Sequence, residues 1–185
     1  TLLPEQRDYK IQRIDGLKSA MVTPPANILA RIKADGEAVR AARRIDTPLG
    51  DFWQGFDWPA HGRISGVYGS QRILNGQPRQ PHYGIDIASP IGTPVYAPAN
   101  GRITLVKYLY FSGWTIVMAH GLGVNSSFLH LDKTMVKPGA FVTRGAVIGT
   151  IGTTGRATGP HLDWRIDWQG RRIDPGLLVP AMPLK

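Results

Sequence analysis

The sequence predicts a mainly β fold, a small antiparallel β-sandwich or partly open barrel, preceded by an N-terminal segment with one helix. From Trp58 onward, short runs of β-forming residues alternate with glycine- and proline-containing turns. These runs show no convincing helical pattern and no repeat of fixed period. The 185 residues are enough for one ordinary domain with an appendage.

Residues 1–57 are predicted to be an N-terminal extension. A short extended run covers 9–14, a helix is predicted over 27–45, and 47–50 is predicted to be a linker. The apolar positions of the helix at helical spacing are Ile28, Leu29, Ile32, Val39 and Ala42. We expect this helix to pack on the main domain or to tether it, rather than to bind a partner or regulate.

Four aromatic residues follow the linker: Phe52, Trp53, Phe56 and Trp58. Such a cluster can bind sugar rings, but it more often anchors a linker on a hydrophobic core. We expect the second role here.

The main domain is predicted to cover residues 58–174, followed by a C-terminal tail at 175–185. The predicted strands are 63–68, 93–97, 101–108, 114–119, 123–131, 147–151 and 161–166.

Charge and composition exclude several function classes. Residues 58–185 contain 13 Lys and Arg, 5 Asp and no Glu, a net charge of +8. A general base there must be Asp or His, and a helical His-Glu-x-x-His protease is excluded. The absence of cysteine excludes disulfides and thiolate metal sites. The positive charge favours an anionic partner, which could be nucleic acid, a membrane surface or an acidic polymer such as a cell wall, or it serves solubility alone.

The first residue of the chain and its hydropathy give two weaker indications of function. The chain begins at Thr1 without a signal peptide, which is typical of a mature or trimmed form. We expect no transmembrane segment, because no apolar run is long enough to cross a membrane.

Two stretches are candidate sites, each with a histidine and an aspartate close together in the sequence. His82 and Asp86 are four apart, and on an extended strand they would lie about 13 Å apart. A bend near Gly84 is needed to bring them to one metal ion. His161 and Asp163 are two apart, so on a strand they face the same side.

The other three histidines lie outside these two stretches. His130 lies among apolar neighbours and is a core residue unless it converges with the others. His120, before a glycine, is predicted to be a turn residue, and His61 to lie in a surface loop.

The sequence lacks the residue motifs that several other kinds of site require. The Gly/Thr-rich stretch 152–159 has no Gly-Lys-Ser/Thr ending, and the chain has no Gly-x-Ser-x-Gly motif. A nucleic-acid-binding barrel would leave the His and Asp motifs without a role, so we expect no nucleic acid partner. Two histidines and an aspartate can instead hold zinc, which activates a water, while further histidines move protons.

The order of motifs resembles the lysostaphin/LytM-type zinc endopeptidases, which cut peptidoglycan peptides. The resemblance covers roughly residues 58–174. It is carried by His82-x-Gly84-x-Asp86, by Gly92-Thr93-Pro94-Val95, by Leu129-His130-Leu131, and by Gly152-x-Thr154-Gly155 with Thr158-Gly159-Pro160-His161-Leu162.

This resemblance implies a small antiparallel β domain of the LytM type, a duplicated hybrid motif, with a groove over one zinc ion. His82 and Asp86 would be metal ligands, His161 catalytic, and His130 would orient the attacking water. The third ligand falls at Asp163, where the family usually has histidine.

The aspartate leaves two interpretations open. In the first, Asp163 replaces histidine as a ligand, and two carboxylates cancel the charge of a divalent ion. That predicts a less acidic bound water, a higher pH optimum and tolerance of manganese or other divalent metals beside Zn²⁺. In the second, the site is degenerate, and the domain binds the wall or activates a murein amidase. We favour the enzyme, because four of five positions match and the fifth still carries a carboxylate.

The resemblance also implies a partner and a place of action. The partner is peptidoglycan, with room for a cell-wall or divisome protein, and the location is the periplasm or the cell surface, with a Gram-negative envelope favoured.

Overall fold

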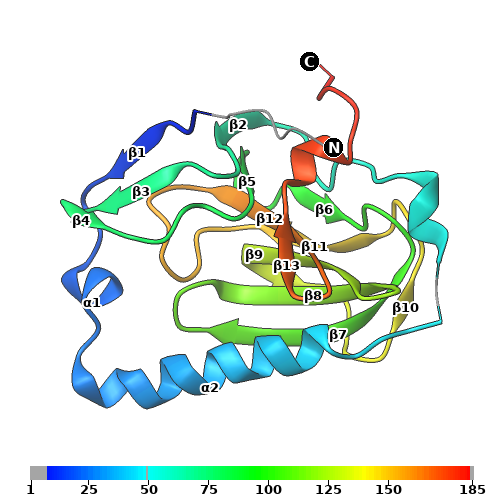
Figure 1. Cartoon of the computed structure of the whole chain (residues 1–185), viewed down its shortest axis with the longest axis horizontal. Coiled ribbons are helices and arrows are strands. Elements are labelled where there is room, and N and C mark those ends of the chain that lie inside the picture. Colours follow the sequence, from blue (N-terminus) through cyan, green and yellow to red (C-terminus); the bar gives the residue numbers. More distant parts are fainter. Residues whose placement is uncertain (1–7, 49, 184–185) are drawn as a thin grey trace, which may run out of the picture.

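A computed structural model of the chain describes residues 8–48 and 50–183. Its main part is a large antiparallel sheet with the strand order β10-β7-β8-β9-β12-β5-β2 (Figure 1). Strand β11 pairs with both β9 and β6, and β13 pairs with β12. A mainly β fold with an antiparallel sheet and one long helix confirms the predicted fold class.

The large sheet contains β2 (Arg63–Gly66), β5 (Ile85–Ala88), β6 (Pro94–Tyr96), β7 (Gly101–Leu109), β8 (Gly113–Gly121), β9 (Val124–Thr134), β10 (Phe141–Val142), β11 (Val147–Ile151), β12 (His161–Trp168) and β13 (Arg171–Ile173). A small sheet contains β1 (Ile11–Ile14), β3 (Gln71–Leu74) and β4 (Gln77–Pro78). The helices are α1 (Ser19–Val22), α2 (Ala26–Arg43), and two 3-10 turns, η1 (Asp51–Gln54) and η2 (Pro175–Leu177).

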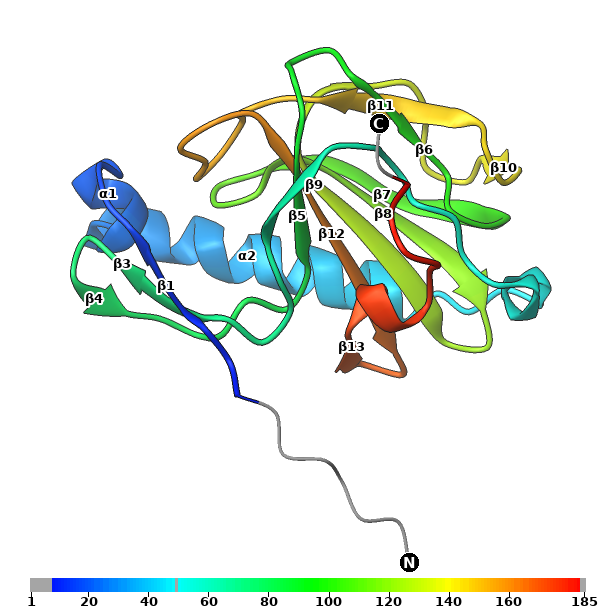
Figure 2. The ribbon, with the colours of Figure 1, turned by 90° about the horizontal axis from the view of Figure 1, so that it is seen from above.

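The large sheet curls around one hydrophobic core, as Figure 2 shows from above. Strand β12 contributes one face to the core and the other face to the site. Leu162, Trp164 and Ile166 alternate along it and are fully buried in the core. The residues between them point to the opposite face, because side chains of a strand alternate. That opposite face carries the polar residues described below.

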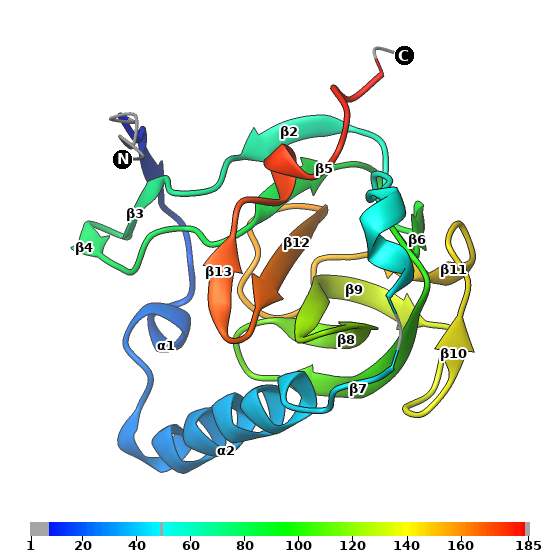
Figure 3. The ribbon, with the colours of Figure 1, turned by 45° about the vertical axis from the view of Figure 1, so that its right-hand side comes forward.

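The segment before residue 45 follows the open side of the sheet. Strand β1 pairs in parallel with β3, and α2 packs along β7 and β8 (Figure 3). Helix α2 agrees with the predicted helix to within two residues at each end. Its predicted apolar stripe is only partly correct, because Leu29 is 54% exposed and Asp35 is buried instead. Asp35 accepts a hydrogen bond from the Tyr110 backbone N–H at 2.8 Å, so α2 is anchored partly by a polar contact.

All seven predicted strands are present, β11 with the predicted ends and the other six with shifted ends, but the short strands β3, β4, β5, β10 and β13 were not predicted. The β3–β4 hairpin has a sequence signal, because Asn75 and Gly76 both adopt positive φ at its turn. An Asn-Gly pair between two strands is typical of a two-residue hairpin. This hairpin matters because β3 carries Arg72 to the site.

One further prediction differs from the structure. His120 is not a turn residue: it lies on β8, is buried, and bonds the Asn100 carbonyl at 2.7 Å and the Ser126 hydroxyl at 2.8 Å. Of the predicted linker, residue 49 lies outside the described residues. The predicted tail packs on the core through Leu178, Val179 and Met182 as far as it is described, and residues 184–185 lie outside that part.

The aromatic residues after the linker anchor the chain on the core, as expected. Phe56 is buried and meets the His120 ring edge-on at 5.2 Å between centroids, and Trp58 meets Trp164 at 6.0 Å. Trp53 is the exception, with 70% of its surface exposed. Residues from both sides of the predicted boundary at 57/58 share this core, and the boundaries themselves stay a prediction. None of the described helices is long and apolar enough to span a membrane.

Candidate active site

The register between β5 and β12 places two carboxylates opposite each other. Asp163 pairs directly with Asp86 across the two antiparallel strands. Like charges in directly opposed positions repel at about 5 Å between Cβ atoms and destabilise a sheet unless a cation lies between or beside them. Both aspartates are buried, and Asp163 has no exposed surface. The fold therefore requires positive charge at this point.

His82 reaches the same point from the loop before β5. The chain bends at Gly84, as the sequence predicted it must, and His82 Nε2 lies 3.0 Å from Asp86 Oδ1. The bend is tightly packed, because a Cβ atom on Gly84 would lie 2.5 Å from Asp163 Oδ1. A residue with a side chain at this position would push Asp163 out of place.

His82, Asp86 and Asp163 together form a group that can hold a metal ion. Each offers one ligand atom, and these atoms all lie within 4.8 Å of one another. His82 Nε2 and Asp86 Oδ1 are buried and lack a hydrogen-bond partner despite their short separation. Two buried polar atoms left without partners, both facing one point, are what an ion would satisfy.

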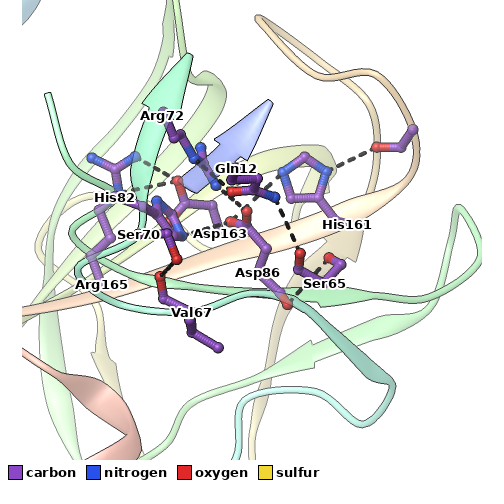
Figure 4. A network of polar contacts seen from close by, with 11 residues as sticks. Gln12, Ser65, Val67, Ser70, Arg72, His82, Asp86, His161, Asp163 and Arg165 are labelled. Carbon is purple, nitrogen blue, oxygen red and sulfur yellow. Dashed lines mark hydrogen bonds and ion pairs between the residues drawn. The ribbon is translucent and has the colours of Figure 1, made fainter. Parts of the chain in front are cut away.

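Two arginines hold the carboxylates from other directions (Figure 4). Arg165 Nε lies 2.9 and 3.1 Å from the two oxygens of Asp163, and its Nη2 lies 2.5 Å from Oδ2. Arg72, on β3, ion-pairs with Asp86 Oδ2. Together these guanidinium groups neutralise both aspartates.

Arg165 keeps Asp163 ionised, whereas His82 and then Arg72 keep Asp86 ionised. Burial alone would raise the pKa of Asp163, but the charge of Arg165 outweighs it, so the pKa lies well below its usual value. The pKa of Asp86 is also lowered: burial opposes ionisation, and His82 and Arg72 outweigh it. Both side chains are carboxylates at neutral pH, as metal ligands must be.

His130 and His161 form a second pair beside the carboxylates, with ring centroids 4.8 Å apart. His130 Nδ1 lies 2.7 Å from the Thr154 carbonyl and His161 Nδ1 lies 2.9 Å from the Gly159 carbonyl. A carbonyl only accepts, so each Nδ1 carries the hydrogen and each Nε2 keeps a free lone pair. His161 Nε2 faces the site at 3.9 Å from Asp86 Oδ1.

The position of His130 depends on a local irregularity of β9. The β8–β9 register shifts between Trp114 and Ile116, and His130 has φ +63°. A bulge of this kind redirects a side chain out of the regular alternation. Burial, followed by the neighbouring His161, lowers the pKa of His130 to about 4, so its imidazole is neutral at pH 7.

Two cavities open on the site from either side. The first, of about 590 Å³, is lined by Asp86 and His161 and is walled by β1. Gln12 of β1 is part of this wall. Its side chain accepts a hydrogen bond from Arg72 Nε at 3.2 Å and donates one to the Ser65 carbonyl at 3.2 Å. The second, of about 410 Å³, is lined by Asp163 and His130 and lies between α2 and the sheet.

A family model described as peptidase family M23 matches residues 80–175. This range includes the five predicted site residues, His82, Asp86, His130, His161 and Asp163. That stretch is more than half of the chain. The chain belongs to peptidase family M23. This confirms the family predicted from the order of the motifs.

Solved M23 structures superpose on most of the chain. A putative M23 peptidase from Pseudomonas aeruginosa is 38% identical with a TM-score of 0.71, covering 81% of this chain and 61% of that one. The catalytic domain of lysostaphin from Staphylococcus simulans is 31% identical with a TM-score of 0.57, covering 63% of this chain and 90% of that one. A zinc-containing peptidase from Vibrio cholerae is 34% identical with a TM-score of 0.62, covering 70% and 41%.

Among curated proteins, the peptidoglycan DD-endopeptidase ShyA of Vibrio cholerae is 40% identical over 113 residues, 60% of this chain and 26% of ShyA. ShyB of the same organism is 42% identical over 94 residues, 51% of this chain and 22% of ShyB. The chain thus spans about a quarter of the length of these relatives.

The residues of this M23 chain fit the zinc ion that the family implies. One imidazole nitrogen and two carboxylate oxygens are a donor set that zinc accepts. His82 Nε2 and Asp86 Oδ1 support this fit, because both are buried, lie 3.0 Å apart and have no hydrogen-bond partner. Asp163 fits less freely, because Arg165 occupies both of its oxygens.

Two site residues were missed from the sequence. Arg165 lies two positions after Asp163, so the alternation that put His161 and Asp163 on one face also placed Arg165 there. Arg72 had only an indirect signal, the Asn75-Gly76 turn that predicts its hairpin.

Proposed function

We propose that this chain is a metal-dependent endopeptidase that hydrolyses peptide bonds in peptidoglycan stem peptides or cross-links. The observation that carries the proposal is the buried group of His82, Asp86 and Asp163 beside two histidines with free Nε2 lone pairs. The names of the ShyA and ShyB relatives supply the substrate class. A function in the wall places the chain outside the cytoplasm.

In this proposal His82, Asp86 and Asp163 hold the zinc ion. A bound zinc ion supplies Lewis-acid chemistry to a peptide carbonyl and to a water. His161 is placed to accept a proton at Nε2, because its Nδ1 hydrogen is held by the Gly159 carbonyl. His130, held in the same tautomer by the Thr154 carbonyl, orients the water with its neutral Nε2.

The resulting proton path needs only these side chains. His161 takes the proton of the attacking water and returns it to the amine of the leaving peptide, as one general base and acid can in peptide hydrolysis. The positive charges of Arg72 and Arg165 keep the carboxylates from taking the proton instead.

The test is digestion of purified peptidoglycan, with released fragments identified by mass spectrometry. We expect released stem peptides, and their loss after chelation. His161→Ala should keep bound zinc and lose about two to four orders of magnitude in rate, whereas His61→Ala, at an exposed loop position, should change nothing. No released peptides from zinc-loaded protein, or loss of zinc in His161→Ala, would contradict the assigned roles.

One observation favours a second candidate function. Both carboxylates already have an arginine partner, so the site is electrically balanced without an ion. A domain in this state would bind the wall or activate a separate amidase without chemistry of its own. Zinc content decides between the two, since the binding module predicts none at micromolar free zinc while the peptidase predicts one ion per chain.

A further inference from the structure

The second cavity is unusually rich in arginine. It lies between α2 and the strands β9 and β12, with a volume of about 410 Å³. Six of its lining residues are arginines: Arg40, Arg43, Arg72, Arg156, Arg165 and Arg172. Only two are acidic, Asp35 and Asp163. Nothing in the proposed catalysis uses this excess of positive charge.

Ion pairs account for half of the arginines. Arg72 pairs with Asp86, Arg165 with Asp163, and Arg43 with Asp167 at 2.9 Å. Asp35 is engaged by Lys107 at 3.6 Å and by Arg31 at 4.0 Å, both outside the cavity lining. Within residues 8–48 and 50–183, no carboxylate lies at ion-pair distance from Arg40, Arg156 or Arg172.

The unpaired arginines include a buried donor without an acceptor. Nη1 of Arg172 is buried and has no hydrogen-bond partner. An unmet buried donor of a charged group has lost its hydration without gaining a protein partner, and a ligand oxygen would restore the hydrogen bond. This is an independent sign that an acceptor belongs here.

Arg156 is held in place for such a ligand. Its guanidinium stacks on the Phe111 ring at 4.5 Å from the centroid, and its Nη1 donates to the Met21 carbonyl at 3.1 Å. A guanidinium fixed by stacking loses little freedom when it binds. Burial and the neighbouring Arg72 lower the pKa of Arg156 to about 10, and burial and Arg172 do the same for Arg43. An anion in the cavity would relieve this mutual repulsion.

We propose that the cavity binds a carboxylate of a peptide that lies across the site. Arginine suits a planar carboxylate because its donors match the two oxygens. Asp163 and His130 line the same cavity, so the bound carboxylate lies next to the proposed metal centre. The cavity thereby selects peptides with a free carboxylate near the bond that is cut. The choice of a peptide as ligand rests on the proposed function.

The test compares acetyl-Ala-D-Ala-D-Ala with its C-terminal carboxamide. Both are titrated by NMR against chelator-treated protein, so that binding is measured without any cleavage. We expect the carboxylate form to bind roughly tenfold more tightly, with a preference that shrinks from about 0.05 M to about 0.5 M salt. Equal affinity for the two forms would overturn the proposal, even if the protein proves to be a peptidase.

Matched variants locate the effect. Arg172→Gln should lose most of the preference, whereas Arg171→Gln, its exposed neighbour on β13, should keep it. If Arg172→Gln does not fold, Arg40→Gln on the exposed side of α2 replaces it, with Arg44→Gln as its control. Equal loss in a variant and its control would show that the preference reflects total charge, against the proposal.

Inorganic phosphate distinguishes a peptide end from a free anion. In the same titration, phosphate should displace the carboxylate peptide and not the carboxamide. Phosphate binding that depends on Arg172 without any preference among the peptides would overturn the peptide assignment.

Discussion

Asp163 and Arg165, two positions apart on β12, form a two-point ion pair inside the candidate metal centre. Two cations therefore compete for the carboxylate of Asp163: the guanidinium of Arg165 and the proposed zinc ion. Arg72 stands in the same relation to Asp86. The balance between these partners decides how tightly the chain binds metal.

The arginines also change the charge argument made from the ligands alone. Two carboxylates and a divalent ion sum to zero, which predicted a weakly activated water and a higher pH optimum. With Arg72 and Arg165 beside them, the loaded site carries +2. The reason for expecting a high pH optimum is thereby removed.

Replacing Arg165 should strengthen metal binding and weaken the metal-free fold. In Arg165→Met, the buried Asp163 loses its partner, which costs about 3 kcal/mol of unfolding free energy without metal. A zinc ion then gains the freed oxygens, so its affinity should rise at least about tenfold. Zinc titration and thermal unfolding with and without zinc measure both effects.

Arg171→Met is the matched control, because Arg171 is exposed on β13. It should change neither quantity. Zinc affinity that falls in Arg165→Met would mean that Arg165 positions Asp163 for the metal rather than competing for it.

Gly84 should be intolerant of a side chain. In Gly84→Ala the new Cβ would lie 2.5 Å from Asp163 Oδ1, closer than real contacts allow. We expect a loss of about 1–3 kcal/mol in stability and weaker zinc binding. Gly159→Ala is the control, because a Cβ there meets nothing within 4 Å. Normal zinc affinity in Gly84→Ala would place the metal away from Asp163.

His120 should make the fold sensitive to acid. Burial lowers the pKa of His120 to about 4, opposed by the Asn100 carbonyl, against 6.5 in the unfolded chain. The unfolded state therefore binds the proton first. The stabilisation by neutral His120 is complete above pH 6.5 and is lost as the pH falls toward 4, by roughly 3 kcal/mol.

Urea unfolding at pH 7 and pH 4 measures this loss. His120→Gln should be less stable at pH 7 and should lose less stability between the two values. Parallel pH profiles for the wild type and His120→Gln would show that the imidazole is charged in the fold.

The features that could be predicted from the sequence are those that depend on residues close together in the chain. Runs of β-forming residues bounded by glycine- and proline-containing turns located β7, β8, β9, β11 and β12, because both signals lie within or beside each strand. The bend at Gly84 followed from the reach of an extended chain. The motifs likewise located the five site residues, whose roles stay predictions.

Contacts between distant segments were not predictable in this way. Arg72 reaches Asp86 through a hairpin whose pairing partner β1 comes from the N-terminal extension. Asp35, polar on a helix face expected to be apolar, is buried by a bond to Tyr110 that depends on how α2 docks. Both depend on tertiary packing, and no local pattern specifies it.

The most direct test of the metal centre is anomalous diffraction from crystals grown with zinc, recorded at the zinc absorption edge. The structure predicts one peak in contact with His82 Nε2, Asp86 Oδ1 and an oxygen of Asp163. A crystal without a peak among these three side chains, or with the ion held by His130 and His161 instead, would contradict it.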